Sequence, residues 1–341
     1  MKRASKSKPA TLAPPAITMA LKALLDAEAG FDIEYGGGLS NHRPMTLQAL
    51  ARLGADAARL QAWAAAYERQ LRPAPAHQPW PAGDAWFAAL GQRDAWPLYR
   101  DLFAQWLDNE AAGDVLQQVL PRLMQGVAGA AFHGVIRTAH AVAAAHRGEL
   151  ADALAYWATR WTPLGADSPD TPPSTRDPEA VLRQLARVQV DSPFLMPGLR
   201  AAATVPGFDA LAASLATDAG TVPALARLAA KAYAASGNFS VLHLLTSALA
   251  MQELLPFIDP DDEAALAAAR AAYWRAFMAT VASAGIEVLP PVAARPWPAL
   301  RAAAIGHADE HVIKLVDAAV QWQARDPAGP WAAAAARALA A

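Results

Sequence analysis

The chain has 341 residues, of which 54% are hydrophobic and 18% are charged, and its formal net charge is −2. This balance excludes a disordered chain, and the lack of a basic excess removes the electrostatic basis for binding nucleic acid. The sequence contains no cysteine, which excludes disulfide bonds, thiolate zinc sites, iron–sulfur clusters and cysteine nucleophiles.

Alanine dominates the composition, and β-branched residues do not gather into alternating runs of strand length. Because alanine is the best helix former and the apolar residues follow a helical period, we expect an all-α protein. We predict one large helical domain over residues 16–341, built as a multi-helix bundle, after a disordered basic tail at residues 1–15.

The expected helices follow from apolar periodicity and from the positions of proline and glycine. In chain order they cover residues 16–29, 41–53, 84–112, 113–147, 178–190, 206–217, 222–236, 238–255, 261–284, 308–325 and 330–341. The loops expected between them include 30–40, 72–84, 162–178 and 290–298. In the second helix Pro44 lies within the first turn, where proline is tolerated, and Gly54 ends the helix.

The sequence favours a cytoplasmic protein without a membrane partner. The apolar core of a signal peptide does not precede Pro14 and Pro15. Residues 232–252 carry no formal charge and are about long enough to cross a bilayer, but Gly237 and His243 interrupt this stretch. We therefore interpret it as a buried helix of the core.

Several common motifs of nucleotide, metal and hydrolase sites are absent from the sequence. The run Gly36-Gly37-Gly38 follows no expected strand and does not match G-x-G-x-x-G. There is no P-loop, H-E-x-x-H, G-x-S-x-G or EF-hand pattern, and the E-x-x-H pairs of di-iron bundles are also absent.

Four of the eight histidines each introduce or lie within an apolar helical segment: His42, His133, His243 and His311. This distribution suggests several helices that direct imidazoles towards one metal site in the core of the bundle. Each histidine also has an ordinary interpretation. His42 could be a polar residue at a helix N-terminus, and His133 and His243 could be core histidines that bond to a carbonyl.

The last histidine segment adds a lysine. His311 and Lys314 are three residues apart and share a helical face, on which His307 lies one turn earlier. The alternative is that Glu310 and Lys314 form an i,i+4 ion pair on a solvated stripe.

Four segments, taken in this order, resemble the questin oxidase-like family, which is named for an enzyme of fungal anthraquinone breakdown and has many bacterial members. They are Asn41-His42-Arg43-Pro44-Met45, Phe132-His133-Gly134-Val135-Ile136-Arg137, Leu242-His243-Leu244-Leu245-Thr246-Ser247 and Asp309-Glu310-His311-Val312-Ile313-Lys314-Leu315. Each segment is short, but the four together are fairly specific and extend over about residues 20–320.

The resemblance implies a site with non-haem iron, Fe(II), held by four histidines and an N-carboxylated lysine. Carried over by position, the ligands are His42, His133, His243, His311 and Lys314, and His307 is the residue that could replace or assist His311. By proximity in sequence, the residues expected to orient the imidazoles are Asn41, Arg137, Thr246 and Glu310.

The resemblance also implies oxygen-dependent ring cleavage of an aromatic polyketide or anthraquinone-like substrate, by Baeyer–Villiger-type or dioxygenase chemistry. The partners would be a small aromatic substrate and O2, with NADPH as a possible reductant. Two other functions stay open: a hydrolase with histidine-bound zinc or manganese, and a helical binding or scaffold protein without catalysis.

Overall fold

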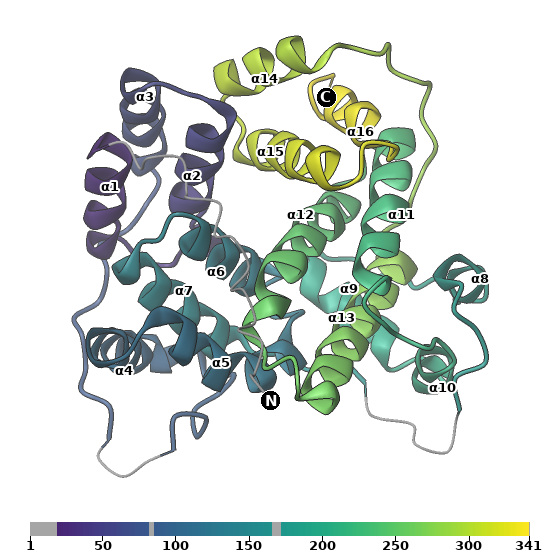
Figure 1. Ribbon diagram of the computed structural model, residues 1–341, viewed down its shortest axis with the longest axis horizontal. Helices are drawn as coiled ribbons and strands as arrows, with labels where there is room; N and C mark the ends of the chain where they lie inside the picture. The colour runs from purple at the N-terminus through teal and green to yellow at the C-terminus, as the bar shows by residue number, and fades with distance from the viewer. Residues whose placement is uncertain (1–18, 82–84, 166–171, 341) are drawn as a thin grey trace, which may run out of the picture.

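The computed structural model describes residues 19–81, 85–165 and 172–340 (Figure 1). The predicted tail at residues 1–15 and part of the predicted loop at 162–178 lie outside the described residues. The α-helices are α1 (Met19–Asp26), α2 (Arg43–Leu53), α3 (Ala57–Glu68), α4 (Trp96–Asn109), α5 (Ala112–Leu123), α6 (His133–Ala143), α7 (Arg147–Arg160), α8 (Pro178–Leu182), α9 (Leu195–Ala203), α10 (Phe208–Ala213), α11 (Thr221–Ser236), α12 (Phe239–Leu254), α13 (Glu263–Ser283), α14 (Trp297–Gly306), α15 (Glu310–Arg325) and α16 (Trp331–Ala338). Four 3₁₀ turns are η1 (Ala27–Gly30), η2 (Arg93–Ala95), η3 (Met124–Gly126) and η4 (Leu255–Phe257).

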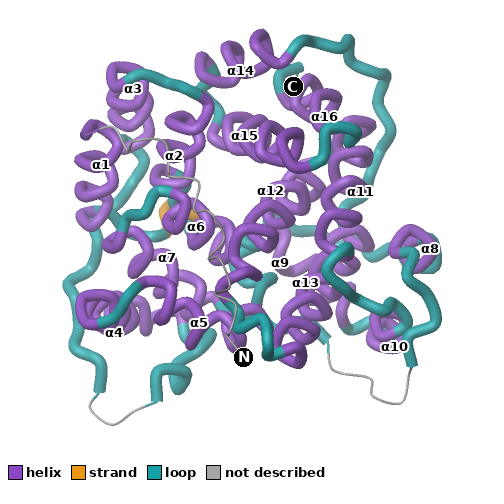
Figure 2. Tube along the Cα trace, in the orientation of Figure 1, coloured by secondary structure: helices purple, strands orange, loops and turns teal. Residues whose placement is uncertain are grey.

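The all-α prediction is confirmed, because helices dominate the described residues and one short hairpin accompanies them (Figure 2). This hairpin pairs β1 (Glu34–Tyr35) with β2 (Leu39–Ser40) and replaces the flexible loop expected at residues 30–40. Its turn contains Gly36, Gly37 and Gly38, all with positive φ, which side chains other than glycine rarely adopt. The glycine run therefore specifies the tight turn of this hairpin.

Four helices that are distant in sequence pack around one another at the middle of the molecule. Helix α2 contacts α6, α6 contacts α12, α12 contacts α15, and α15 contacts α2 (Figure 1). These helices are buried over much of their surface: α12 is buried continuously from Val241 to Met251 and α15 from Val312 to Val320. Their closed arrangement brings their N-terminal ends to a common region.

The uncharged stretch 232–252 is divided between two helices. Gly237, with a φ of 61°, ends α11, and the Asn238 side chain caps α12 by accepting hydrogen bonds from the amides of Ser240 and Val241. The two helices pack against each other in the core. Among the helices that the structure describes, none combines the length and the apolar character needed to traverse a bilayer.

Several helix boundaries differ from the sequence-based expectation. The segment predicted as one helix at 113–147 is interrupted after α5, because Pro121 lies in its last turn and η3 follows. Helices α9 and α14 were not predicted, no bounds were predicted for α3 and α7, and α8 is much shorter than the expected helix at 178–190. The division of the chain into a tail and one domain over residues 16–341 stays a prediction.

Candidate metal centre

Each of the four central helices carries one imidazole at or near its N-terminal end. His42 is the residue before α2, His133 begins α6, His243 lies one turn into α12, and His311 is the second residue of α15. The rings form a closed circuit, with centroid distances of 4.6 Å (His42–His133), 5.1 Å (His133–His243), 5.6 Å (His243–His311) and 4.6 Å (His311–His42). Residues separated by most of the chain therefore meet at one place.

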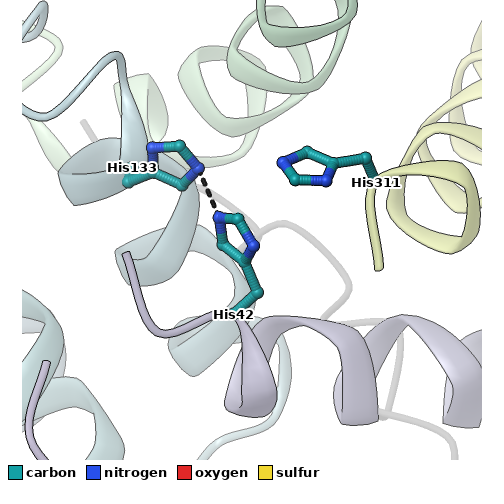
Figure 3. Close-up of side chains that lie close together, drawn as sticks. All are labelled: His42, His133 and His311. Carbon is teal, nitrogen blue, oxygen red and sulfur yellow. Dashed lines mark hydrogen bonds between the residues drawn. The ribbon is translucent and has the colours of Figure 1, made fainter. Parts of the chain in front are cut away.

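The closest approach within this histidine cluster, His42, His133, His243 and His311, is between two nitrogens. His42 Nε2 and His133 Nε2 are 2.7 Å apart (Figure 3). Each of His42, His133 and His311 offers a nitrogen, and these three atoms lie within 4.8 Å of one another. His243 completes the circuit through its ring contacts with His133 and His311.

Backbone carbonyls determine which nitrogen carries the proton in two of the rings. His133 Nδ1 lies 2.5 Å from the carbonyl oxygen of Ala130, and His243 Nδ1 lies 2.9 Å from that of Phe239. A carbonyl oxygen only accepts, so each Nδ1 must donate. In the neutral imidazole the Nε2 atom then carries a lone pair, which is the tautomer that a metal ligand requires.

The carboxylate of Glu310 has the same effect on His42, because its Oε1 lies 3.1 Å from His42 Nδ1. His42 Nε2 and His133 Nε2 then face each other at 2.7 Å with two lone pairs, an arrangement that is repulsive unless a cation lies near both. The Nε2 atom of His243 is buried and has no hydrogen-bond partner among the described residues. Buried polar atoms are normally paired, and a bound cation would be the missing partner of this atom.

A proton does not fill this role at neutral pH. Burial, followed by the nearby positive charge of Lys314, lowers the pKa of His42 well below its ordinary value. Burial likewise lowers the pKa of His133 well below 6.5 and that of His243 to about 3. Neutral imidazoles suit iron, zinc, copper and nickel, so the donor set fits a transition metal ion.

Lys314 lies in the interior beside the histidine cluster. Its residue is 3% exposed, and its ammonium forms no hydrogen bond or ion pair within the described part of the chain. Burial lowers the pKa of Lys314 to about 8, against the opposing effect of Glu310 and Asp309. The solvated Glu310–Lys314 ion pair considered from the sequence is therefore not formed.

The start of α15 holds two carboxylates against the cluster. Asp309 caps the helix by accepting hydrogen bonds from the amides of His311 and Val312. Hydrogen bonding to His311 lowers the pKa of Asp309 below its usual range. Sequence reasoning did not assign a role to Asp309, although an aspartate directly before an apolar helical run is a typical N-cap.

A buried network of ion pairs joins the helices that carry His42 and His133. Arg43 Nη1 donates to Glu28 Oε2 at 2.7 Å, and the Asn41 side chain donates to Glu28 Oε1 at 2.5 Å. Arg137 makes two hydrogen bonds with Glu149, at 2.6 and 2.9 Å, and its Nη2 lies 3.9 Å from Glu28. Glu28 thus links the residues that flank His42 with the first turns of α6.

The residues expected to orient the imidazoles do so unequally. Glu310 bonds directly to His42, whereas Asn41 bonds to Glu28 and to the amide of Arg43. The other two bond elsewhere: the Arg137 guanidinium to Glu149, and the Thr246 hydroxyl to carbonyls of its own helix. Among the described contacts, only Glu310 of this set is hydrogen-bonded to an imidazole of the cluster.

The remaining histidines lie outside the cluster. His307 accepts a hydrogen bond from the Asp309 amide, so the structure brings His311 rather than His307 into the ring of imidazoles. His140 is bonded to Gln48, at 2.7 Å. His146 caps α7 by accepting from the amide of Glu149.

A short segment of unusual backbone precedes His133. Ala130, Ala131 and Phe132 all have positive φ, between 50° and 69°, a conformation that costs about 1–2 kcal/mol for each residue other than glycine. Gly134 follows because a Cβ atom there would lie 2.8 Å from the Trp157 side chain. The segment directs His133 into the cluster. In the sequence, the signal for this unusual backbone is the pair of glycines on either side, Gly129 and Gly134.

Comparison with known protein families agrees with the resemblance noted from the sequence. The model of the questin oxidase-like family matches residues 39–319, a range that contains all four histidines of the cluster and Lys314. Helices α1 and α16 lie outside the matched range. A comparison with curated proteins gives no match.

Proposed function

Because the chain belongs to the questin oxidase-like family, we propose that it is an iron-dependent oxygenase that cleaves a ring of an aromatic polyketide or anthraquinone-like substrate. The family supports the coarser assignment, an oxidoreductase acting on aromatic polyketides. The observation that most directly supports a bound metal ion is the 2.7 Å distance between two unprotonated atoms, His42 Nε2 and His133 Nε2.

The residues proposed to hold iron are His42, His133, His243, His311 and Lys314. When bound, Fe(II) would supply the redox centre that brings dioxygen and the organic substrate together. The donor set fits this role because imidazoles are suitable iron ligands but are uncharged, so that an anionic ligand is needed to offset the charge of the ion.

Lys314 can supply that anion. The lowered pKa, about 8, makes its neutral amine accessible close to neutral pH. A neutral amine adds carbon dioxide and releases one proton, which gives an anionic carbamate. We propose this N-carboxylated form as the fifth ligand, in the position where commoner iron sites use a carboxylate.

In three of the four imidazoles the chain keeps the proton on the side away from the proposed ion. Carbonyls of Ala130 and Phe239 accept from Nδ1 of His133 and His243, and Glu310 accepts from Nδ1 of His42. Such partners fix the orientation of each ring and raise its basicity as a ligand. Removing Glu310 should therefore weaken metal binding without removing a ligand.

The proposal is tested by metal analysis and oxygen uptake. Protein purified without added metal, or reconstituted with Fe(II) under argon, should hold about one iron per chain and consume oxygen with an anthrahydroquinone faster than the protein-free solution does, since anthrahydroquinones also react with oxygen uncatalysed. The His42→Ala variant should lose both properties. The matched control is His140→Ala, because His140 is a partly buried histidine with a partner outside the cluster. Less than about 0.2 iron per chain after reconstitution would contradict the proposal.

Two further measurements separate the alternatives. Oxygen uptake is compared with and without NADPH, which tests whether a nicotinamide serves as reductant. Retention of zinc or manganese with ester or amide hydrolysis and without oxygen uptake would indicate the hydrolase. Normal folding without any bound metal would indicate a scaffold.

A further inference from the structure

A small cavity lies beside the histidine cluster. Its volume is about 140 Å³, it is partly open to solvent, and it is bounded by the segment that leads into α9, by the start of α12 and by the end of α13. Phe239 and Ser240 line it from α12, Ser283 lines it from α13, and Gly198 lines it from α9. Because Phe239 is also part of the surroundings of the cluster, this cavity and the proposed metal site share a wall.

Phe239 forms that wall. The centroid of its ring lies 4.8 Å from the His243 ring and 4.9 Å from the His311 ring, both in edge-to-face contact. The residue is nevertheless 53% exposed. An apolar ring that contacts two proposed ligands on one side and remains open on the other is suited to contact a bound molecule.

Helix α9, which contributes Gly198 to the lining, contacts the segment before His133 through Met196, a residue outside the lining. The sulfur of Met196, in the first turn of α9, accepts a hydrogen bond from the amide of Ala131 at 3.2 Å. Ala131 belongs to the left-handed segment that positions His133. The two sides of the cavity are thus connected to His133 on one side and to His243 and His311 on the other.

The lining defines the chemistry of the ligand. It includes Phe194 and Val190, which are 46% and 40% exposed, together with the hydroxyls of Ser192, Ser240 and Ser283. None of the described residues that line it is charged. By contrast, the larger cavity near the β1–β2 hairpin is lined by three arginines and three acidic residues. The small cavity therefore favours an uncharged molecule with apolar faces and hydroxyl or carbonyl groups at its edge.

The volume sets the size of the part that enters. An engineered apolar cavity of about 150 Å³ holds one benzene molecule, so a cavity of this volume accommodates about one six-membered ring. Gly198 allows α9 to approach α13 closely at the edge of the cavity, because a Cβ atom there would lie 3.0 Å from Cβ of Ser283.

We propose that this cavity binds one uncharged aromatic ring of the substrate, a phenol, hydroquinone or quinone ring, and that Phe239 is the specificity-determining wall between that ring and the histidine cluster. The statement that this ligand is a substrate rests on the proposed function. Any further rings would lie outside the cavity, against the exposed side chains of Phe194 and Val190.

Binding is measured on the metal-free protein under argon, with hydroquinone as the probe, by isothermal titration calorimetry and saturation-transfer NMR. Phe239→Ala should weaken binding about three- to tenfold, the range expected for loss of one aromatic contact. Ser240→Leu should weaken it at least about tenfold, because the larger side chain occupies a one-ring cavity. Benzoate, which carries a negatively charged carboxylate on its ring, should bind much more weakly than hydroquinone does.

The matched control is Phe87→Ala, because Phe87 is 44% exposed but lies outside this cavity. It should bind hydroquinone as the unchanged chain does. Equal affinity in Phe239→Ala and Phe87→Ala would overturn the proposal, and so would equal affinity for benzoate and hydroquinone. Circular dichroism and thermal unfolding check that each variant folds, and Phe194→Ala replaces Ser240→Leu if that variant does not.

The binding assay can contradict the ring site without contradicting the proposed function, and the reverse is also true. A chain that binds hydroquinone in this cavity but retains no iron would contradict the oxygenase and leave the ring site standing. A chain that retains iron and consumes oxygen, but whose hydroquinone affinity is unchanged by Phe239→Ala and Ser240→Leu, would contradict the ring site alone.

Discussion

The two halves of the histidine cluster are built in different ways. The half formed by α2 and α6 is braced by buried charges: Arg43 and Arg137 lie beside His42 and His133, and Glu28 connects them. In the half formed by α12 and α15 the buried ion pairs lie farther along the helices, where Arg52 contacts Glu253 and Asp317, and among the described residues none pairs with His243. There the imidazoles contact Phe239, which is open to solvent on one side.

The difference suggests a division of labour between the halves. Buried ion pairs hold two helix starts in one relative position, since their charges are costly to separate from their partners. The half formed by α12 and α15, in contrast, offers the exposed ring of Phe239, which a substrate ring can cover. The braced half therefore sets the distance between His42 and His133, and the open half admits the ligand.

Removal of Glu28 should produce the largest loss of stability. In Glu28→Ala, Arg43 and Arg137 each lose a buried carboxylate partner, and breaking a buried ion pair costs about 3–5 kcal/mol of the free energy of unfolding. Urea denaturation of the metal-free protein measures this loss. Arg183→Ala is the control, because its ion pairs are exposed and should contribute less than about 0.5 kcal/mol. A loss below about 1 kcal/mol in Glu28→Ala would mean that the network does not brace this half.

Replacement of Lys314 should have the next largest effect and the opposite sign. The folded protein holds a buried ammonium without a partner, and the pKa falls from 10.5 to about 8. Lys314→Met should therefore stabilise the metal-free protein at pH 7 by roughly 2–3 kcal/mol, while lowering its affinity for iron.

The pH dependence of this gain follows from the two pKa values of the lysine. Below pH 8 both the folded and the unfolded chain carry the proton, so the penalty of the buried charge is complete. Between pH 8 and 10.5 only the unfolded chain keeps the proton, and the penalty shrinks as the pH rises. Denaturation in CO2-free buffer from pH 7 to 10.5 should show the advantage of Lys314→Met disappearing. An advantage that is constant across this range would contradict the assignment.

The sequence was sufficient to predict the fold class and the histidine cluster. Helical periodicity is a local property, and it correctly located the cores of α2, α11, α12, α13 and α15. The four histidines were found because each lies next to an apolar helical run. Their convergence depends on how the helices pack, and it was expected from the recurrence of histidines in apolar segments and from the family resemblance.

Features that depend on tertiary contacts were not predicted. The left-handed residues before His133 include Ala130 and Ala131, and alanine locally favours a right-handed helix. Packing of Gly134 against Trp157 and the hydrogen bond from His133 to Ala130 override that preference. The role of Glu28 was also missed, because its partners lie as far away in sequence as Arg137.

The smallest effect on stability is expected for His243, a histidine of the cluster, which we compare with His146, a histidine outside it. His243 Nε2 has no partner, so His243→Leu removes a buried polar atom that is unpaired in the metal-free protein. His146 uses both nitrogens, since Nε2 contacts Asp26 at 2.9 Å and Nδ1 accepts from the Glu149 amide. His146→Leu should therefore cost about 1–2 kcal/mol of the free energy of unfolding, whereas His243→Leu should change it by less than about 1 kcal/mol.

Iron content should show the reverse order. The His243→Leu protein should fold as well as the unchanged chain but retain less iron after reconstitution, because one proposed ligand is lost. His146→Leu should retain iron, because His146 caps α7 and lies outside the cluster. If His243→Leu destabilised the metal-free protein as much as His146→Leu and left the iron content unchanged, His243 would be an ordinary core residue. The cluster would then bind metal, if at all, through the remaining imidazoles.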